Sequence, residues 1–567
     1  MKAVTQILCV LCALCGLAVD VSALDREAFT FTNYDLNVRL EPEQQRLAVR
    51  GKISLRNDSG VPQKNVSLQI SSSLGWRSIQ FEGKPVQFVS QPYASDIDHS
   101  GALSEAIVTL PREVPPKASI DLEVGYEGVI PLDATRLTRI GVPDDQARHS
   151  DWDQISPSFT AVRGVGYVAW YPVAMDSANL SEGNSVEETV ARWKARQSDT
   201  AMSASFESTM NQPIFFSGAA QSATAKLDVT AAKILTFRMI GQGLDVPTFV
   251  TGNYQRLASG DLATVEYLPG QEEGAKVYAA AAAQVDPTVP VEHGPANLQI
   301  LGLPDHQAAS FVSEGMLLCP LKPALTNEAV LNIVYAKARQ MVKSPRAWIQ
   351  DGLARYAQVR YIEQNSGRQA ALDYLKAHGQ PVIDADRASQ DPAEKTNGTT
   401  PSLVDAPDDF YLQAKAMYVW WMLHDMLEAN RTAFSYSSTE DKEPSYMQHV
   451  LEKQSHRDLQ WFFNDWVYHD RGLPEFRVDP VFARQLSGGA YIVTVTIENA
   501  GSAGAEVPVI VRTQGGDVTK RLIVPAKTKK SIRIEAAATP TEVVVNDGSV
   551  PEINMRNNTY KIESLSQ

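Results

Sequence analysis

The 567-residue chain contains only four cysteines, and three of them lie within its first 15 residues. We interpret residues 1–23 as a signal peptide, because Lys2 is followed by an apolar run and then by small residues that suit cleavage. Removal of this segment leaves Cys319 alone, so the mature chain has no partner for an internal disulfide. We therefore predict an exported protein, periplasmic or extracellular, that is stabilised by its packed cores.

Long apolar runs and positive charge are also scarce. Beyond the first segment no stretch approaches the ~18 apolar residues of a membrane-spanning helix, so no membrane span is predicted. Lys and Arg number 52 against 66 Asp and Glu, a net charge of −14, and no local basic stripe offsets it. Nucleic acid is therefore excluded as a partner. A serine hydrolase is disfavoured because the chain has no Gly-x-Ser-x-Gly motif.

The N-terminal part of the mature chain alternates apolar and polar residues with a period of two. The alternation is clear at 34–40, 51–57 and 66–70, with turn residues between these segments. Such a pattern predicts an antiparallel β domain, which we place at residues 24–270. Further strand-like segments within it occur at 225–229, 234–240, 247–254 and 263–267.

The middle of the chain changes to a helical pattern, with one strand predicted at 298–303. We predict a mixed, mainly helical domain at 271–471 and no regular structure in the polar segment 381–408. The predicted helices cover 275–284, 327–342, 347–364, 367–377, 409–428, 444–454 and 456–469.

Alternation of period two returns after Gly472, for example at 491–497 and 507–511. This pattern predicts a C-terminal β-sandwich at 472–567. The predicted fold class is therefore multidomain α+β, with β domains on both sides of a mainly helical one.

A narrow polar stripe runs along the predicted helix 327–342, which is otherwise apolar. Glu328, Asn332, Tyr335 and Arg339 fall within an arc of roughly 60° at 100° per residue. Polar groups on a largely buried helix need water or polar partners. The stripe therefore indicates either a helix edge in solvent or a face that lines a site.

Several segments in the same order resemble the membrane alanyl aminopeptidase family of gluzincin metallopeptidases. Trp348-Ile-Gln-Asp-Gly-Leu-Ala-Arg-Tyr resembles the family's Trp-Leu-Asn-Glu-Gly-Phe-Ala-x-Tyr helix, and Gly315-Met316-Leu317 stands where its Gly-x-Met-Glu-Asn strand should be. The segment Phe410-Tyr411-Leu-Gln-Ala-Lys-Ala resembles the helix that carries the family's catalytic tyrosine. The resemblance implies a thermolysin-like middle domain, an immunoglobulin-like C-terminal sandwich and a catalytic role for Tyr411.

The chain departs from this family at the metal site. The family binds zinc through His-Glu-x-x-His and a glutamate on the next helix, and the Glu of the motif is the general base. None of the nine histidines here forms an i, i+4 pair, and none lies between 307 and 377. Two registers remain possible, one placing Glu328–Asn332 at the motif and the other, which we prefer, placing Tyr335–Arg339 there. The base is then Ala329 or Ala336.

The preferred register predicts an ion pair instead of a metal. Arg339 cannot ligate a cation, whereas Asp351, at the position of the family's third ligand, is a natural counter-ion for it. The other register leaves Glu328, Asn332 and Asp351 as an oxygen cluster for a hard cation, although three ligands fall short of a usual shell. We therefore expect no cofactor, even though the family would imply zinc.

The functional hypothesis is an exported aminopeptidase-like protein with a degenerate zinc site. It is expected to be non-catalytic and to bind a peptide or protein in the former active-site cleft. The predicted lining is Glu328, Asn332, Gly315 and Met316, beside the former metal positions Tyr335, Arg339 and Asp351, with Tyr411 on another wall. Two alternatives stay open: an active metalloaminopeptidase with an unorthodox site, and a structural or adhesive multi-β surface protein.

Overall fold

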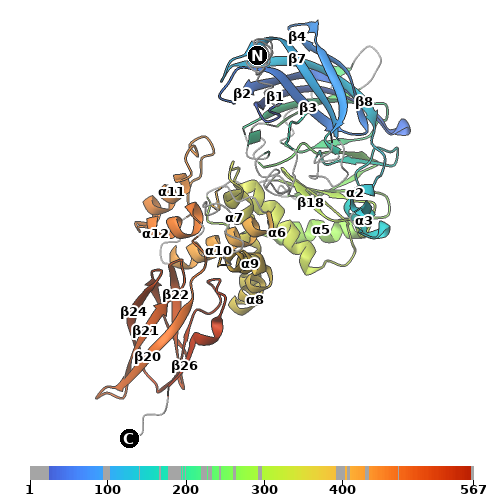
Figure 1. Cartoon of the computed structure of the whole chain (residues 1–567). Helices are drawn as coiled ribbons and strands as arrows, with labels where there is room; N and C mark the ends of the chain where they lie inside the picture. Colours follow the sequence, from blue (N-terminus) through green and yellow to red (C-terminus); the bar gives the residue numbers. More distant parts are fainter. Residues whose placement is uncertain are drawn as a thin grey trace, which may run out of the picture.

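The computed structural model describes most of residues 24–562. The described ranges exclude 94–102, 140, 165–167, 177–192, 194–195, 198, 219–225, 228–232, 240, 242–243, 260–262, 292–296, 391–401, 405–408, 428–432 and 470. The predicted signal peptide at 1–23 lies outside the described residues. Figure 1 shows the N-terminal sheets at one end, the helices in the middle and the C-terminal strands at the other end.

An eight-stranded sheet dominates the N-terminal part. Alternate side chains of its strand β1, such as Tyr34, Leu36 and Val38, are fully buried, as the period-two pattern predicted. The sheet is mixed, because β1 pairs in parallel with β10. Its strands in spatial order are β12 (Lys226–Leu227), β13 (Lys233–Met239), β10 (Ala201–Ser208), β1 (Phe29–Glu41), β2 (Arg46–Asn57), β8 (Ser119–Val129), β4 (Leu74–Phe81) and β5 (Lys84–Pro85).

The prediction of a purely antiparallel domain was therefore wrong at one pairing. The β1–β10 pair joins residues 168 positions apart, and alternation along a single strand does not distinguish a parallel neighbour from an antiparallel one. The described residues of this part also form two three-stranded sheets and two short helices. They are β3 (Gln63–Ser71), β7 (Leu103–Val114) and β6 (Gln87–Tyr93), then β11 (Ile214–Phe216), β14 (Phe249–Gly252) and β9 (Phe159–Val162), with α2 (Thr135–Arg139) and α3 (Asp144–Ser150).

A five-stranded sheet and helix α5 (Glu272–Gln284) begin the middle part. The strands in spatial order are β15 (Gln255–Ser259), β16 (Ala263–Tyr267), β17 (Leu298–Gly302), β19 (Met316–Cys319) and β18 (Phe311–Ser313). The boundary predicted between 270 and 271 divides this sheet, because β16 pairs in parallel with β17. Local alternation marked β15 and β16 as strands but could not show which sheet they join.

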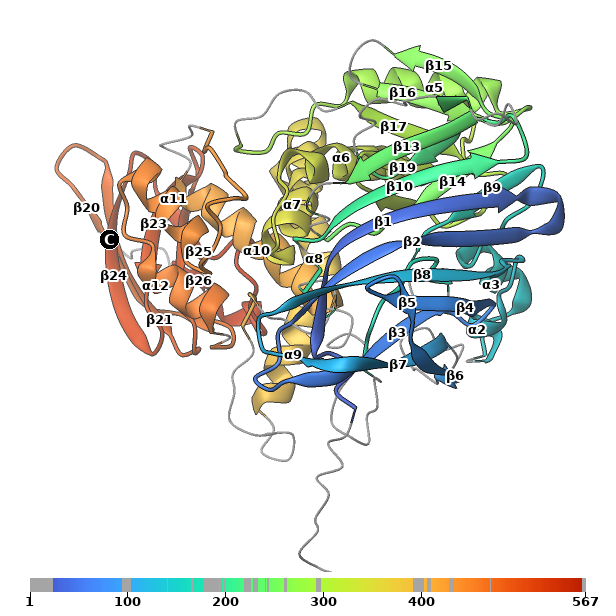
Figure 2. The same cartoon turned by 90° about the horizontal axis from the view of Figure 1, so that it is seen from above.

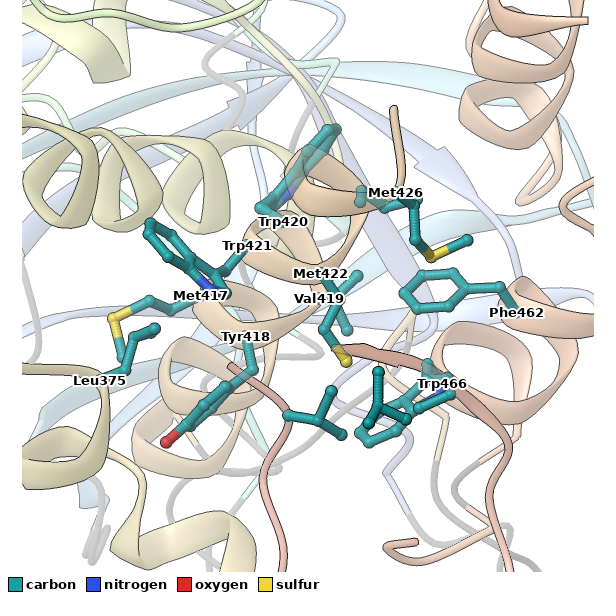
Figure 3. Close-up of a cluster of buried hydrophobic side chains, with 14 of the residues drawn as sticks. Leu375, Met417, Tyr418, Val419, Trp420, Trp421, Met422, Met426, Phe462 and Trp466 are labelled. Atoms are coloured by element: carbon teal, nitrogen blue, oxygen red, sulfur yellow. The ribbon is translucent and has the colours of Figure 1, made fainter. Parts of the chain in front are cut away.

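The helices that follow agree closely with the helical pattern. They are α6 (Asn327–Met341), α7 (Ala347–Ser366), α8 (Arg368–His378), α9 (Gln380–Gln390), α10 (Asp409–Leu427), α11 (Tyr446–Ser455) and α12 (Gln460–Phe463), with a π-helical turn at Asn464–Tyr468. Helix α10 is buried on most of its sides. Trp421, Met422 and Tyr418 leave it in different directions among buried side chains of the neighbouring helices (Figure 3).

Two helix predictions need correction. Residues 380–390 form helix α9, although the segment 381–408 was expected to lack regular structure. Pro381 lies in the first turn, where the backbone amides have no partner within the helix, so its missing amide proton breaks no helical hydrogen bond. The side chain of Val382 is buried and packs in the core. The last predicted helix, 456–469, starts only at Gln460, because His456 adopts a left-handed conformation that ends α11.

The C-terminal strands form two sheets, as the returning alternation predicted. One contains β20 (Phe476–Gln485), β21 (Tyr491–Asn499) and β24 (Thr528–Ala536). The other contains β23 (Val518–Val524), β22 (Ala505–Thr513), β25 (Pro540–Val545) and β26 (Thr559–Lys561). Valines from both sheets belong to the same buried cluster as Trp466 and Phe463 of the helical part. The immunoglobulin-like type of this unit remains a prediction.

No helix in the described part of the chain is both long and apolar enough to cross a membrane. Figure 2, seen from above, shows the five-stranded sheet and helices α6 and α7 beside the strands of the N-terminal sheet. This junction contains the candidate site.

Candidate functional site

A cavity of about 850 Å³ lies between the N-terminal strands and helix α6. Its apolar wall includes Phe215, Phe216 and Phe237 from β11 and β13. Gly315 and Met316, predicted to line a cleft, do line it. The other described residues around it are Pro213, Ile214, Gly218, Leu235, Asp245, Arg256, Thr264, Asn297, Gln299, Val312, Glu314, Ala336, Arg339, Gln340 and Lys343.

Helix α6 presents one side to this cavity. The helix starts at an N-cap, where the Thr326 hydroxyl accepts a hydrogen bond from the amide of Ala329 at 3.2 Å. Ala336, Arg339 and Gln340, three to four residues apart, line the cavity, and Lys343 follows just beyond the helix end. Positions three and four apart share a helix face, so α6 supplies part of the polar wall through Arg339 and Gln340.

Arg339 is the central residue of the site, with 9% of its side chain exposed. Its Nε donates to Oδ1 of Asp351 on α7 at 2.7 Å, which confirms the predicted pair. The Tyr335 hydroxyl donates to the same oxygen at 3.0 Å. Tyr335 and Arg339 of α6 thus both bond to Asp351 of α7.

Asp245 is a second carboxylate on the same guanidinium, and sequence analysis missed it. Its Oδ1 accepts from Nη1 of Arg339 and, at 3.1 Å, from the amide of Glu314. Gln350 of α7 approaches Oδ2 at 3.4 Å. Asp245 lies between β13 and β14, about 90 residues before Arg339. Its position next to the strand-like segment 247–254 is the one signal in the sequence that points to it. Arg339 therefore connects the N-terminal part, α6 and α7.

A second ion pair lies on the cavity wall between Lys343 and Glu314. Desolvation lowers the pKa of Lys343. The other carboxylate oxygen of Glu314, Oε2, is buried and has no hydrogen-bond partner among the described residues. Glu314 precedes Gly315, whose φ of +74° suits glycine. The cavity therefore combines an apolar wall with charges of both signs.

The polar stripe lies mostly outside the cavity. Of its four residues only Arg339 is among the described lining residues, so the predicted lining by Glu328 and Asn332 was wrong. Glu328 is exposed in the first helical turn and Asn332 is half-buried. Tyr335 is directed at α7, where the Arg355 guanidinium lies 4.6 Å from the centre of its ring. The stripe thus finds its polar partners on α7 and in solvent.

Tyr411 is also placed differently from the prediction. It is buried on α10, and its hydroxyl accepts a hydrogen bond from Nζ of Lys415 at 2.8 Å. Tyr411 is not among the described residues that line the cavity, so it does not form the second wall expected of it. Burial lowers the pKa of Lys415 to about 7. The similarity of local sequence located the helix correctly but could not give the direction of this side chain.

The side chains at the predicted metal position do not fit zinc. Zinc takes histidine, cysteine and a limited number of carboxylate ligands, whereas here a guanidinium lies between two carboxylates. Among the described residues no group of three or more His, Cys, Asp or Glu side chains could hold a metal ion. The alternative oxygen cluster is not assembled either, because Glu328 precedes Tyr335 by seven residues, about 10 Å along the helix axis.

Comparison with known proteins gives a likeness of fold at low identity. No protein-family model matches the sequence, and no curated protein matches it. Among solved structures, the chain is similar to an M1 zinc metallopeptidase from Deinococcus radiodurans, with 14% identity and a TM-score of 0.46 over 79% of this chain and 96% of that one. It is also similar to a single-site mutant of an M1 zinc metallopeptidase from the same organism, bound to a Tyr-Ser-Ala substrate. That match has 14% identity and a TM-score of 0.45 over 78% of this chain and 94% of that one.

Proposed function

We propose that this protein is an exported aminopeptidase-like chain that has lost metal-dependent catalysis and binds peptides in the cavity beside Arg339. The observation that carries the proposal is the bonding of Arg339. Its guanidinium joins Asp351 and Asp245, and the family resemblance assigns Arg339 and Asp351 to former zinc-ligand positions. A fixed positive charge at that point repels a metal cation.

The general base of such a peptidase is also replaced. In the register that we prefer from the sequence, Ala336 stands at the position of the catalytic glutamate, and Ala336 lines the cavity. A methyl group can neither abstract a proton from water nor return one to a leaving amine. Binding without turnover is therefore the function that these residues support.

The shape and chemistry of the cavity suit a short peptide. Its volume of about 850 Å³ is typical of a site that encloses a ligand of a few residues. The three phenylalanines and Met316 offer apolar contacts for side chains, while Glu314 and Lys343 offer charges that complement free peptide termini. An apolar wall with a few convergent polar groups is the usual composition of a ligand site.

Calorimetric titration of the mature chain with the tripeptide Phe-Ala-Phe, its termini free, tests peptide binding. We expect saturable binding of one peptide per chain. Met316→Trp should abolish it by filling the cavity, whereas Val89→Trp, at an exposed position, should leave it unchanged. Absence of binding by the unaltered chain would favour the structural-protein alternative.

Loss of metal chemistry is tested separately by elemental analysis and by turnover. We expect substoichiometric zinc in the purified protein, and hydrolysis of alanine and leucine p-nitroanilides no faster than in a heat-denatured control. One tightly bound zinc per chain, or turnover that a chelator abolishes, would instead establish the alternative of an active metalloaminopeptidase. The peptide-binding result does not depend on this outcome.

A further inference from the structure

A second cavity lies within the helical part, away from the site at Arg339. Helices α7, α10 and α11 and the segments 288–290 and 433–434 surround about 250 Å³. The two segments are joined by a hydrogen bond from the amide of Phe434 to the carbonyl of Pro290 at 2.9 Å. Among the described residues, none lines both this cavity and the first one.

One wall of this second cavity is aromatic. The ring of Trp420 is stacked with Trp348 at a centroid distance of 5.5 Å and with Phe434 at 6.1 Å. Its Nε1 donates to the backbone carbonyl of Trp348 at 2.9 Å, which fixes the orientation of the indole. Trp420 leaves α10 on the side opposite to Tyr418 (Figure 3). A preformed flat wall favours a flat ring, because stacking then requires little further ordering of side chains.

Aliphatic side chains form the neighbouring wall. Leu423 of α10 and Leu451 of α11 are buried, and Leu427 and Val289 are half-buried. Ala433 is exposed and marks the mouth of the cavity. A ligand that enters there therefore meets apolar surface on both sides.

The buried polar side chains of the cavity wall are bonded to other groups of the protein. Arg360 forms an ion pair with Glu363 on the same helix. The hydroxyl of Tyr356 lies 2.8 Å from Nδ1 of His424, and Oγ of Ser455 donates at 2.7 Å to a backbone carbonyl of its own helix. The charge of Arg360 is thus balanced within the protein, so a charged ligand would lose its hydration without gaining an opposite free charge. An uncharged ring has no such cost.

We propose that this second cavity binds a small uncharged aromatic molecule of one or two fused rings. The ring lies against Trp420 and Phe434, and Leu423 and Leu451 contact it from the aliphatic wall. The volume of about 250 Å³ is below the roughly 300–1,000 Å³ of most drug-sized sites, which excludes a peptide of several residues. Apolar cavities of roughly 150 Å³ already stay dry and accept such molecules, because the ligand supplies dispersion contacts that the lining atoms otherwise lack.

Titration of the mature chain with three matched probes tests the chemical class. Indole is neutral, indole-3-acetate carries a carboxylate, and tryptamine carries an ammonium group. Calorimetry should show one saturable site for indole, and both charged compounds should bind about tenfold more weakly or less, because each buries a charge without a partner. Absence of saturable indole binding, or binding of either charged compound as tight as that of indole, would overturn the proposal.

A second pair of probes tests the shape of the ligand. Toluene and methylcyclohexane are both neutral and similar in size, but only toluene is flat. We expect toluene to bind about threefold more tightly or better, since only a planar ring stacks on the aromatic wall. Equal affinity for the two compounds would refute the preference for an aromatic ring.

Three variants test the location. Ala433→Trp, at the exposed mouth, should abolish the saturable binding of indole by filling the entrance. Ser435→Trp, at an exposed position that is not among the described lining residues, is the matched control and should leave the affinity unchanged. Met316→Trp in the first cavity should not change it either, and saturating Phe-Ala-Phe should not compete with indole. Indole binding that survives Ala433→Trp, or that Met316→Trp or the peptide removes, would overturn the assignment to this cavity.

Discussion

At the scale of single residues, Arg339 has a structural role, because it joins α6 to α7 and to the segment that contains Asp245. It is almost fully buried, and its charge is balanced by Asp351 and Asp245. Desolvation makes a buried ion pair expensive to form, but removal of one partner leaves an unbalanced charge, which is far worse. These two ion pairs therefore hold three segments together only while Arg339, Asp351 and Asp245 are all present.

Arg339→Ala should lower the free energy of unfolding by about 3–5 kcal/mol, because two carboxylates would then be buried without a counter-ion. The triple variant Arg339→Met, Asp245→Asn and Asp351→Asn should lose less than the single variant, since no unbalanced charge remains. Urea denaturation followed by far-UV circular dichroism measures both. Arg477→Ala removes a solvent-exposed partner of Glu498 and serves as a control, with an expected loss below about 1 kcal/mol. An Arg339→Ala variant as stable as the parent would contradict the structural role.

Glu552 gives the C-terminal part a specific pH dependence. Burial raises the pKa of this carboxyl from 4.5 to about 7, although the amide of Phe476 and the side chains of Asn546 and Asn558 donate to it. The folded state thus holds a proton that the unfolded chain releases near pH 4.5. This contribution to stability is complete below pH 4.5 and is lost as the pH rises through 7.

Between pH 5 and pH 8 this group alone should lower the free energy of unfolding by about 3 kcal/mol. Glu552→Gln should remove that component, because an amide carries no titrating proton and still accepts through its oxygen. Urea titrations at several pH values, on parent and variant, give the difference directly. Identical pH profiles for the two proteins would show that the carboxyl is already ionised at pH 5.

At the scale of elements, α8, α10 and β23 are joined by ion pairs across the boundary between the helices and the C-terminal sheets. Asp425 of α10 accepts from Nη1 and Nη2 of Arg368 at 3.1 and 2.8 Å, and from Nη1 of Arg521 on β23 at 3.2 Å. Arg368 also reaches Asp547, which precedes the last strand, at 3.0 Å. This network fixes the C-terminal part against the helices.

Asp425→Asn should therefore loosen that boundary. Asp425 is buried, so neutralising its charge leaves Arg368 and Arg521 without their shared counter-ion. The free energy of unfolding should fall by about 3 kcal/mol. Limited proteolysis should cut the variant faster near residues 470–475, between the helices and β20. Asp384→Asn on the exposed side of α9 is the matched control and should digest like the parent. Equal digestion rates for all three proteins would show that apolar packing alone holds the boundary.

At the scale of the whole molecule, the cavity beside Arg339 lies where the N-terminal strands meet helix α6. Occupation of this cavity should therefore stabilise the chain against unfolding. A ligand that binds only the folded state stabilises it by mass action, by about 2.7 kcal/mol at a concentration one hundred times its dissociation constant.

Phe-Ala-Phe at one hundred times its dissociation constant should therefore raise the free energy of unfolding by about 2.7 kcal/mol. Urea denaturation with and without the peptide gives the difference. Met316→Trp should remove the effect, and Val89→Trp should keep it. A peptide that binds the chain but leaves the free energy of unfolding unchanged would bind the unfolded chain equally well.

Local sequence patterns were enough to predict the order of the elements and the pair of Arg339 with Asp351. Periods of 2 and 3.6 residues follow from local backbone geometry, so helices α6 and α7 were predicted almost to their ends. Strand β1 begins five residues before the predicted segment 34–40. The opposition of Tyr335 and Arg339 to Asp351 followed from helix spacing and the family resemblance. Gly315 and Met316 were likewise placed correctly on a wall of the cavity.

Which distant groups contact each other became evident only from the packed fold. Asp245 reaches Arg339 across about 90 residues, Glu314 pairs with Lys343, and Tyr411 turns into the core toward Lys415. The parallel pairing of β1 with β10 likewise joins segments that are far apart in the sequence. Periodicity shows which side of an element is apolar but not which element will cover that side. Long-range packing makes that choice, since burial and charge balance are satisfied only when all the segments are in place.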